Sequence, residues 1–204
     1  MSFYFPENFF TRYCAVINKA MNRAVFLDRD GTINVDRHYL SDPALLQIIP
    51  GTGPALRSLM DAGFLLFIVT NQSGIGRGYY TLADMHAVND RLGAELSKEG
   101  VRFEKLYFAP EAPEESSRGR KPSPEFLLDA RDEFGLDLGQ SYMIGDKLID
   151  LQCGWNAGVK KSILVRTGYG SEVEQKSAAA LSNAAIFADV PEAARWILAV
   201  PVQQ

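Results

Sequence analysis

Short apolar segments alternate with longer amphipathic segments along this chain, and this alternation limits the folds that it can adopt. The expected strands are 24–27, 64–69, 104–109, 142–144 and 162–165, with a late edge strand at 186–187. The expected helices are 52–62, 81–99, 123–134, 148–157 and 191–198. Strands that alternate with helices are typical of a parallel sheet covered on both faces. The sequence therefore predicts a doubly wound, Rossmann-like α/β/α fold, without an insertion long enough for a separate cap domain.

Composition limits the kind of protein that this chain can be. Its 204 residues suggest one domain, and a hydrophobic content of 47% is enough for a full core. A net charge of −4 argues against a nucleic-acid-binding protein. Cys14 and Cys153 form neither a disulfide framework nor a zinc motif, and no segment approaches the roughly 18 apolar residues of a membrane span. We expect a cytoplasmic monomer without nucleic-acid or membrane partners.

Residues 1–20 differ in composition from the rest of the chain. They are rich in Phe and Tyr but lack the basic start and apolar core of a signal peptide. Met21 stands just before the first expected strand. Either Met21 is the natural start, or residues 1–20 form a loosely packed extension. In both cases we expect the folded domain to span residues 21–204.

Two carboxylates, Asp28 and Asp30, directly follow the first apolar segment, with Gly31 just beyond them. Ligands of open α/β sheets bind at the carboxyl ends of the strands. One carboxylate at such a place can attack an electrophile, the other can move a proton, and together they can hold a divalent cation. An exposed polar turn is the alternative, but D-x-D-G-T after a hydrophobic strand favours a functional pair.

Polar clusters follow or precede three further expected elements. They are 70–73 after the second strand, 146–147 after the fourth strand and 120–121 before a helix. Each cluster alone is compatible with an ordinary turn or a surface lysine, but the ends of parallel strands meet at one edge of the sheet. Carboxylates suit Mg²⁺, whereas lysine and hydroxyl groups suit phosphate. Asp150 either supports this site or interacts with the dipole of its own helix.

The two histidines and one glycine-rich segment have separate interpretations. His38 lies in a loop after the first strand, where substrate contact is plausible. His86 lies on the expected helix 81–99 and is interpreted as a surface or packing residue. Residues 74–78 follow a strand, but their glycine spacing does not match a dinucleotide-binding loop, so we expect a flexible turn.

These motifs, taken in order, resemble those of the haloacid dehalogenase-like phosphohydrolases. The four motifs are DRDGT, TNQS, RK-P and GDK-x-x-D. The longer segments LDRDGTIN, VTNQSGIGRG, RKPSP and YMIGDKL look like those of the D-glycero-D-manno-heptose 1,7-bisphosphate phosphatases, and the histidinol-phosphate phosphatases share the pattern. The resemblance covers residues 23–168.

The resemblance implies a role for each matching residue. Asp28 would be the nucleophile that forms an aspartyl-phosphate, and Asp30 the general acid and then the general base. Thr70 and Lys121 would stabilise the transferred phosphoryl group. The Asp28 carboxylate, the Asp30 backbone carbonyl and Asp146 would bind Mg²⁺. The residues that would line the substrate site are Asp36, Arg37, His38, Tyr39, Asn71, Gln72, Ser73, Arg120 and Lys147.

One segment departs from the family. Many members carry a structural zinc between the third strand and the RK motif, but residues 109–119 contain neither Cys nor His, so we expect no zinc here. The family uses this loop for substrate choice, which leaves the substrate open. The expected activity is Mg²⁺-dependent hydrolysis of heptose 1,7-bisphosphate to heptose 1-phosphate. The alternatives are a histidinol-phosphate or other small-metabolite phosphatase and, more distantly, a non-catalytic phospho-ligand sensor.

Overall fold

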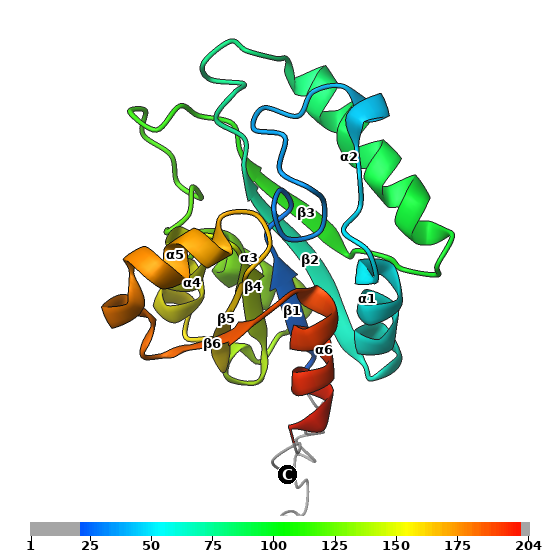
Figure 1. The fold of residues 1–204 in the computed structure, drawn as a ribbon, viewed down its shortest axis with the longest axis vertical. Helices are drawn as coiled ribbons and strands as arrows, with labels where there is room; N and C mark the ends of the chain where they lie inside the picture. Colours follow the sequence, from blue (N-terminus) through cyan, green and yellow to red (C-terminus); the bar gives the residue numbers. More distant parts are fainter. Residues whose placement is uncertain (1–20, 201–204) are drawn as a thin grey trace, which may run out of the picture.

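A six-stranded parallel sheet forms the centre of the molecule. The computed structural model describes residues 21–200, so the predictions for residues 1–20 lie outside it. The strands are β1 (Arg23–Leu27), β2 (Phe64–Asn71), β3 (Lys105–Ala109), β4 (Tyr142–Gly145), β5 (Lys161–Val165) and β6 (Ala184–Phe187). Their order is β3-β2-β1-β4-β5-β6 (Figure 1). The chain therefore reverses its direction of travel across the sheet between β1 and β4, which makes this pair the switch point.

Helices cover both faces of this sheet. They are α1 (Thr52–Asp61), α2 (Leu82–Ser97), α3 (Glu125–Phe134), α4 (Leu148–Ala157), α5 (Gly170–Lys176) and α6 (Val190–Ala199). Buried side chains of α1, α2 and α6 pack on one face, and those of α3 and α4 pack on the other (Figure 1). This arrangement confirms the predicted doubly wound α/β/α fold.

Strand β1 is buried on both faces, which explains its uninterrupted apolar sequence. Val25 and Leu27 belong to the core beneath α1, α2 and α6, whereas Ala24 and Phe26 belong to the core beneath α3 and α4. Successive side chains of a strand point to opposite faces, so a strand between two helical layers must be apolar at every position. The polar residues that follow β1 therefore begin where the core ends.

The ends of the helices agree with the sequence pattern in most places. At the start of α2, Thr81 Oγ1 accepts a hydrogen bond from the Asp84 amide at 3.2 Å, and Asp84 Oδ2 accepts one from the Thr81 amide at 2.8 Å. These two hydrogen bonds form a capping box. The short helix α5 was not predicted, because its polar sequence has no apolar periodicity that distinguishes it from a loop. None of the helices within residues 21–200 is long and apolar enough to cross a membrane.

The central core supports a stability prediction at Phe67. This fully buried ring stacks on Phe26 with centroids 5.2 Å apart and meets Phe134 edge-on at 5.0 Å. We expect Phe67→Ala to lower the free energy of unfolding by about 3–5 kcal/mol. The substitution leaves a cavity between the sheet and the helices packed on it, and these elements cannot move close enough together to fill it. Urea denaturation measures the change. Leu45→Ala, at a side chain that is 59% exposed, is the control and should change stability by about 0.5 kcal/mol or less.

Candidate active site

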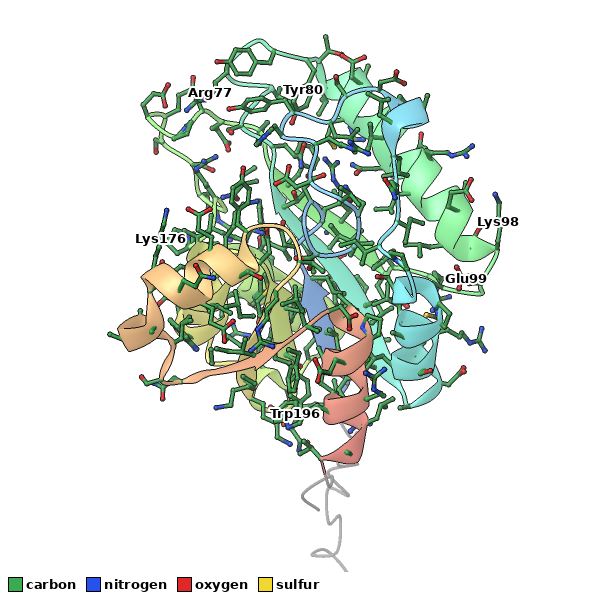
Figure 2. The ribbon with its side chains drawn as sticks, in the orientation of Figure 1. Arg77, Tyr80, Lys98, Glu99, Lys176 and Trp196 are labelled. Atoms are coloured by element: carbon green, nitrogen blue, oxygen red, sulfur yellow. The ribbon has the colours of Figure 1, made fainter. Side chains whose placement is uncertain are left out.

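A polar cavity of about 280 Å³ opens at the carboxyl ends of β1, β2 and β4, at the switch point of the sheet. Tyr80, which lines this cavity, lies at the opposite end of the molecule from Trp196 on α6 (Figure 2). The predicted residues that line it are Asp28, Asp30, Asp36, His38, Tyr39, Thr70, Asn71, Gln72, Ser73, Lys121 and Lys147. Residues from distant parts of the chain thus meet at the edge where the strand pattern predicted them.

Lys121 is the central cation of the cavity. Its Nζ lies 2.7 Å from Asp28 Oδ1 and 2.7 Å from Asp150 Oδ1, and it donates to the Val69 carbonyl at 2.7 Å. The side chain is only 2% exposed. The Asn71 side chain holds the backbone of Lys121 by accepting from its amide at 3.0 Å and donating to its carbonyl at 3.2 Å. The end of β2 therefore fixes the loop that carries Lys121.

Burial and charge act in opposite directions on this group of residues. Burial alone would raise the pKa of Asp28, but the charges of Lys121 and Lys147 outweigh it and lower that pKa below its usual value. Burial likewise disfavours a charged lysine, yet Asp150 and Asp28 raise the pKa of Lys121 above its usual value. Asp28 is therefore held as a carboxylate and Lys121 as an ammonium group. This is the charge state that a nucleophilic carboxylate and an anion-stabilising lysine require.

Asp146 is fully buried at the end of β4, beside Asp28. Its Oδ2 accepts a hydrogen bond from the Tyr169 amide at 2.9 Å, and a Cβ at either Gly31 or Gly168 would overlap this oxygen. Its Oδ1 has no hydrogen-bond partner among the described residues. Burial and the nearby Asp28 raise the pKa of Asp146 to about 8. The glycines thus admit the carboxyl group. Lys147 Nζ lies 3.7 Å from Asp146 Oδ1, but its charge offsets the rise in the Asp146 pKa only in part.

The donor set fits a hard divalent cation. Carboxylate oxygens of Asp28, Asp146 and Asp150 lie within 4.8 Å of one another. Asp150 is already engaged, because its Oδ2 accepts from the Lys147 amide at 2.9 Å and its Oδ1 pairs with Lys121. The oxygens that remain for a cation are Asp146 Oδ1, which has no hydrogen-bond partner among the described residues, and the Asp28 carboxylate oxygen that does not pair with Lys121. Mg²⁺ binds through one or two protein carboxylates and keeps further positions for water and phosphate oxygens.

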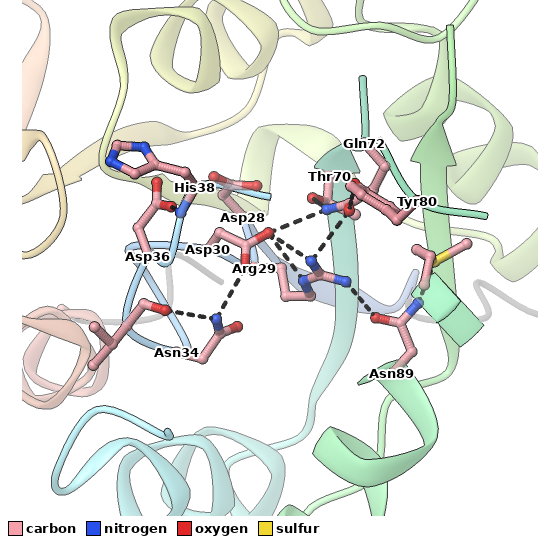
Figure 3. A network of polar contacts seen from close by, with 12 residues as sticks. Asp28, Arg29, Asp30, Asn34, Asp36, His38, Thr70, Gln72, Tyr80 and Asn89 are labelled. Carbon is pink, nitrogen blue, oxygen red and sulfur yellow. Dashed lines mark hydrogen bonds and ion pairs between the residues drawn. The ribbon is translucent and has the colours of Figure 1, made fainter. Parts of the chain in front are cut away.

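The Asp30 side chain belongs to a separate network of hydrogen bonds (Figure 3). Its Oδ2 accepts hydrogen bonds from Arg29 and from Gln72 Nε2, and its Oδ1 accepts one from Asn34 at 2.9 Å. Gln72 Nε2 also donates to Thr70 Oγ1 at 2.8 Å. The Asp30 carboxylate is thus held by Arg29, Gln72 and Asn34, and it is not part of the group of carboxylates formed by Asp28, Asp146 and Asp150.

The loop after β1 borders the cavity, as the position of His38 predicted. Asp36 Oδ2 lies 3.3 Å from Lys147 Nζ, and Asp36 Oδ1 accepts from the His38 amide at 2.6 Å. His38 Nδ1 lies 3.1 Å from the Tyr169 hydroxyl. Tyr80, Ile149 and Tyr169 also line the cavity but were not predicted. Tyr169 follows β5, so the rule that strand ends carry site residues provided a signal for it, whereas nothing in the sequence indicated Tyr80.

Three predicted residues are not among those that line the cavity: the buried Asp146, which was predicted as a metal ligand, and Arg37 and Arg120, which were predicted to contact the substrate. Arg37 is exposed and donates to the Gln47 side chain at 3.1 Å. Arg120 donates to the Glu111 carbonyl at 3.2 Å and so turns toward its own loop. Their proposed contact with substrate remains a prediction.

The loop without zinc ligands is held by hydrogen bonds of its own side chains. The Ser117 hydroxyl donates to Glu111 Oε2 at 2.6 Å, and the Arg120 amide donates to Ser117 Oγ at 3.2 Å. Glu115 Oε2 accepts from the Ala112 amide at 2.7 Å. Carboxylate and hydroxyl groups thus order the segment that leads to Lys121.

Comparison with known proteins identifies the family. The HAD-hydrolase-like family model matches residues 119–193. The D-glycero-beta-D-manno-heptose-1,7-bisphosphate 7-phosphatases of Yersinia pestis and Escherichia coli K12 are 39% and 40% identical to this chain. Each alignment covers 83% of this chain, with 94% and 92% of the respective relative. The chain belongs to the heptose-bisphosphate phosphatase family. It is therefore a phosphoric monoester hydrolase of the haloacid dehalogenase-like group, as its motifs indicated.

A solved member of the heptose-bisphosphate phosphatase family has the same architecture. The D,D-heptose 1,7-bisphosphate phosphatase of B. bronchiseptica, crystallised with magnesium and phosphate, superposes with a TM-score of 0.80. It is 29% identical and the match covers 86% of this chain and 98% of that one. The two chains therefore share one architecture over most of their lengths.

The raised pKa of Asp146 predicts how the stability of the metal-free enzyme depends on pH. Between the ordinary aspartate value of 3.8 and about 8, the folded state binds more protons at Asp146 than the unfolded state does. The free energy of unfolding should therefore fall as pH rises from about 5 to about 8, by at most about 1.4 kcal/mol per pH unit.

Urea denaturation in EDTA at a series of pH values measures this dependence. Asp146→Asn cannot titrate at this position, so its slope against pH should be flatter than that of the wild type. Parallel slopes for the two proteins would contradict the assignment of this proton to Asp146.

Proposed function

We propose that this enzyme removes one phosphate group from D-glycero-D-manno-heptose 1,7-bisphosphate and leaves heptose 1-phosphate. The observation that carries the proposal is the ion pair between Asp28 Oδ1 and Lys121 Nζ, 2.7 Å long and buried at the switch point beside Asp146. The names of the relatives from Yersinia pestis and Escherichia coli support the choice of substrate. Phosphoryl transfer depends mainly on positioning and charge neutralisation, and both are features of this cavity.

In the first step, an Asp28 carboxylate oxygen attacks phosphorus. A P–O bond to Asp28 forms, the bond to the sugar oxygen breaks, and Asp30 gives that oxygen a proton. Lys121 and Thr70 stabilise the charge on the phosphoryl oxygens as it moves. The lowered pKa of Asp28 keeps this carboxylate deprotonated and able to attack.

In the second step, water attacks the aspartyl-phosphate and gives its proton to Asp30. The P–O bond to Asp28 breaks, inorganic phosphate leaves and both carboxyl groups return to their starting states. Splitting one difficult displacement into two steps is the usual advantage of a covalent intermediate. In this scheme Asp30 acts first as an acid and then as a base.

The residues that would hold Mg²⁺ are Asp28 and Asp146 through their carboxylates and Asp30 through its backbone carbonyl. When bound there, Mg²⁺ supplies positive charge to the phosphoryl oxygens. Asp146 Oδ1 supports this assignment, because it accepts no hydrogen bond from the part of the chain that the structure describes. Asp150 keeps Lys121 in place rather than serving as a ligand, because both of its oxygens are already engaged.

The sugar would lie between the loop after β1 and the loop after β2. The side chains proposed to contact it are Asp36, His38, Tyr39, Asn71, Gln72, Ser73 and Lys147, which line the cavity. Arg37 and Arg120 would need a side-chain rearrangement to join them. Histidinol phosphate is the alternative substrate. A monomeric state and a cytoplasmic location remain part of the proposal and follow from composition alone.

A substrate panel tests the proposed activity. The heptose 1,7-bisphosphate, in both anomers, should release phosphate faster than histidinol phosphate or other sugar phosphates, and EDTA should stop the reaction. Phosphate release measured with and without added Mg²⁺ gives the comparison. A folded enzyme that releases phosphate from none of these substrates would refute the proposal, and a preference for histidinol phosphate would replace the substrate alone.

Two substitutions separate the proposed roles of the carboxylates. Asp28→Asn should lower kcat by about 10⁴-fold or more with the fold unchanged, because no nucleophile remains. Asp30→Asn should lower kcat by about 10²- to 10⁴-fold and let phosphoenzyme accumulate, because the general base is lost. Acid-quenched protein analysed by mass spectrometry detects the phosphoenzyme. Substantial turnover by Asp28→Asn would contradict the covalent mechanism.

A further inference from the structure

The proposed chemistry leaves one buried charge in the first motif unexplained. Arg29 stands between Asp28 and Asp30 in the chain, and its side chain is only 1% exposed. It does not line the cavity. A buried guanidinium group costs several kcal/mol unless hydrogen bonds and a counter-charge compensate it. The buried position of this arginine is therefore not explained by packing alone.

The Arg29 guanidinium group contacts the proposed acid and base, Asp30, and two residues that support it (Figure 3). Its Nε and Nη2 donate to the same oxygen, Asp30 Oδ2, at 3.1 and 2.7 Å. Nη2 also donates to Gln72 Oε1 at 3.1 Å, and Nη1 donates to Asn89 Oδ1 at 2.8 Å. The guanidinium group thus connects Asp30 to β2 and to helix α2 at the same time.

Gln72 reinforces this arrangement from the other side of Asp30. Its Oε1 accepts from Arg29 and from the Tyr80 hydroxyl, the latter at 2.6 Å. Because two donors face this oxygen, the amide nitrogen must point the opposite way, toward Asp30 and Thr70. Both hydrogens of Nε2 are used, at 3.1 Å to Asp30 Oδ2 and 2.8 Å to Thr70 Oγ1. Arg29 therefore orients Asp30 both directly and through Gln72.

We propose that Arg29 is the positioning residue for the Asp30 carboxylate, and that Asn89 on α2 keeps Arg29 in place. The inference rests on the proposed role of Asp30 in proton transfer. A proton-transfer group must lie within hydrogen-bond reach of its partner, and a misplacement of about 1 Å can cost about 100-fold in rate. A lysine cannot replace the arginine, because one ammonium group cannot donate to Asp30, Gln72 and Asn89 with the fixed geometry of the fork.

Arg29→Lys tests the inference because it keeps the charge and removes the fork. With p-nitrophenyl phosphate the leaving group departs without a proton, so the first turnover does not need Asp30 as an acid. Breakdown of the phosphoenzyme still needs it as a base. We expect the burst of nitrophenol to keep its rate within about 3-fold, and the steady-state rate to fall by about 10- to 100-fold.

The heptose bisphosphate gives the second readout. With this substrate both steps need Asp30, so Arg29→Lys should lose its burst as well as its steady-state rate, with a change in KM of no more than about 3-fold. Arg23→Lys is the matched control. Arg23 is a partly buried arginine that donates to the Ala62 carbonyl at 2.9 Å. It is the first residue of β1, whereas the cavity lies at the other end of this strand. The Arg23→Lys variant should leave both the burst and the steady-state rate unchanged.

If circular dichroism shows that Arg29→Lys does not fold, Asn89→Ala provides an independent test. This variant leaves Arg29 in place but removes its contact with α2, and it should slow the second phase selectively, by about 3- to 10-fold. With p-nitrophenyl phosphate, equal loss in both phases, or no loss in either phase, would overturn the inference while the proposed function stands. A wild-type enzyme without phosphate release from any phosphomonoester would overturn the proposed function and this inference with it.

Discussion

The buried ammonium group of Lys121 determines how the other elements of the site must meet. Its three hydrogens face acceptors from three places, namely Asp28 after β1, the Val69 carbonyl on β2 and Asp150 on α4. Removal of one partner from a buried pair typically costs about 3–5 kcal/mol, because the remaining charge is left without compensation. Apolar side chains of the core can repack when these elements shift slightly. The ammonium group cannot adapt in this way, because a small shift would remove one of its acceptors. Apolar packing stabilises the sheet, and the contacts of Lys121 fix how the carboxyl ends of β1 and β2 and helix α4 lie relative to one another.

The sequence was sufficient to predict which residues lie at the carboxyl edge of the sheet, because this follows from the direction of the strands. Asp28 and Asp146 each come directly after an apolar strand, and Thr70 lies at the carboxyl end of β2; parallel strands bring such residues to one edge of the sheet. Lys121 follows no strand, and its own sequence context was also compatible with a surface lysine, so only the family motif gave it a specific role. The short helix α5 was missed because a polar segment of this length has no periodicity.

The orientation of individual side chains was beyond the reach of sequence reasoning. The Asp30 carboxylate turns toward Arg29 because Gln72 and Asn89 complete a network that joins residues up to 60 positions apart. Arg120 turns toward the Glu111 carbonyl, a contact set by the conformation of one loop rather than by a pattern. Such choices depend on three or four partners at once, and no local motif encodes them.

The start of helix α4 is tied to the charge balance of the cavity through one residue. Asp150 accepts from the Lys147 amide at 2.9 Å with one carboxylate oxygen and pairs with Lys121 through the other. Fraying of the first turn of α4 and exposure of the Lys121 charge are therefore one event rather than two. The site and this helix end form a single cooperative unit, so the reactive carboxylate keeps its counter-charge for as long as the first turn of α4 stays wound.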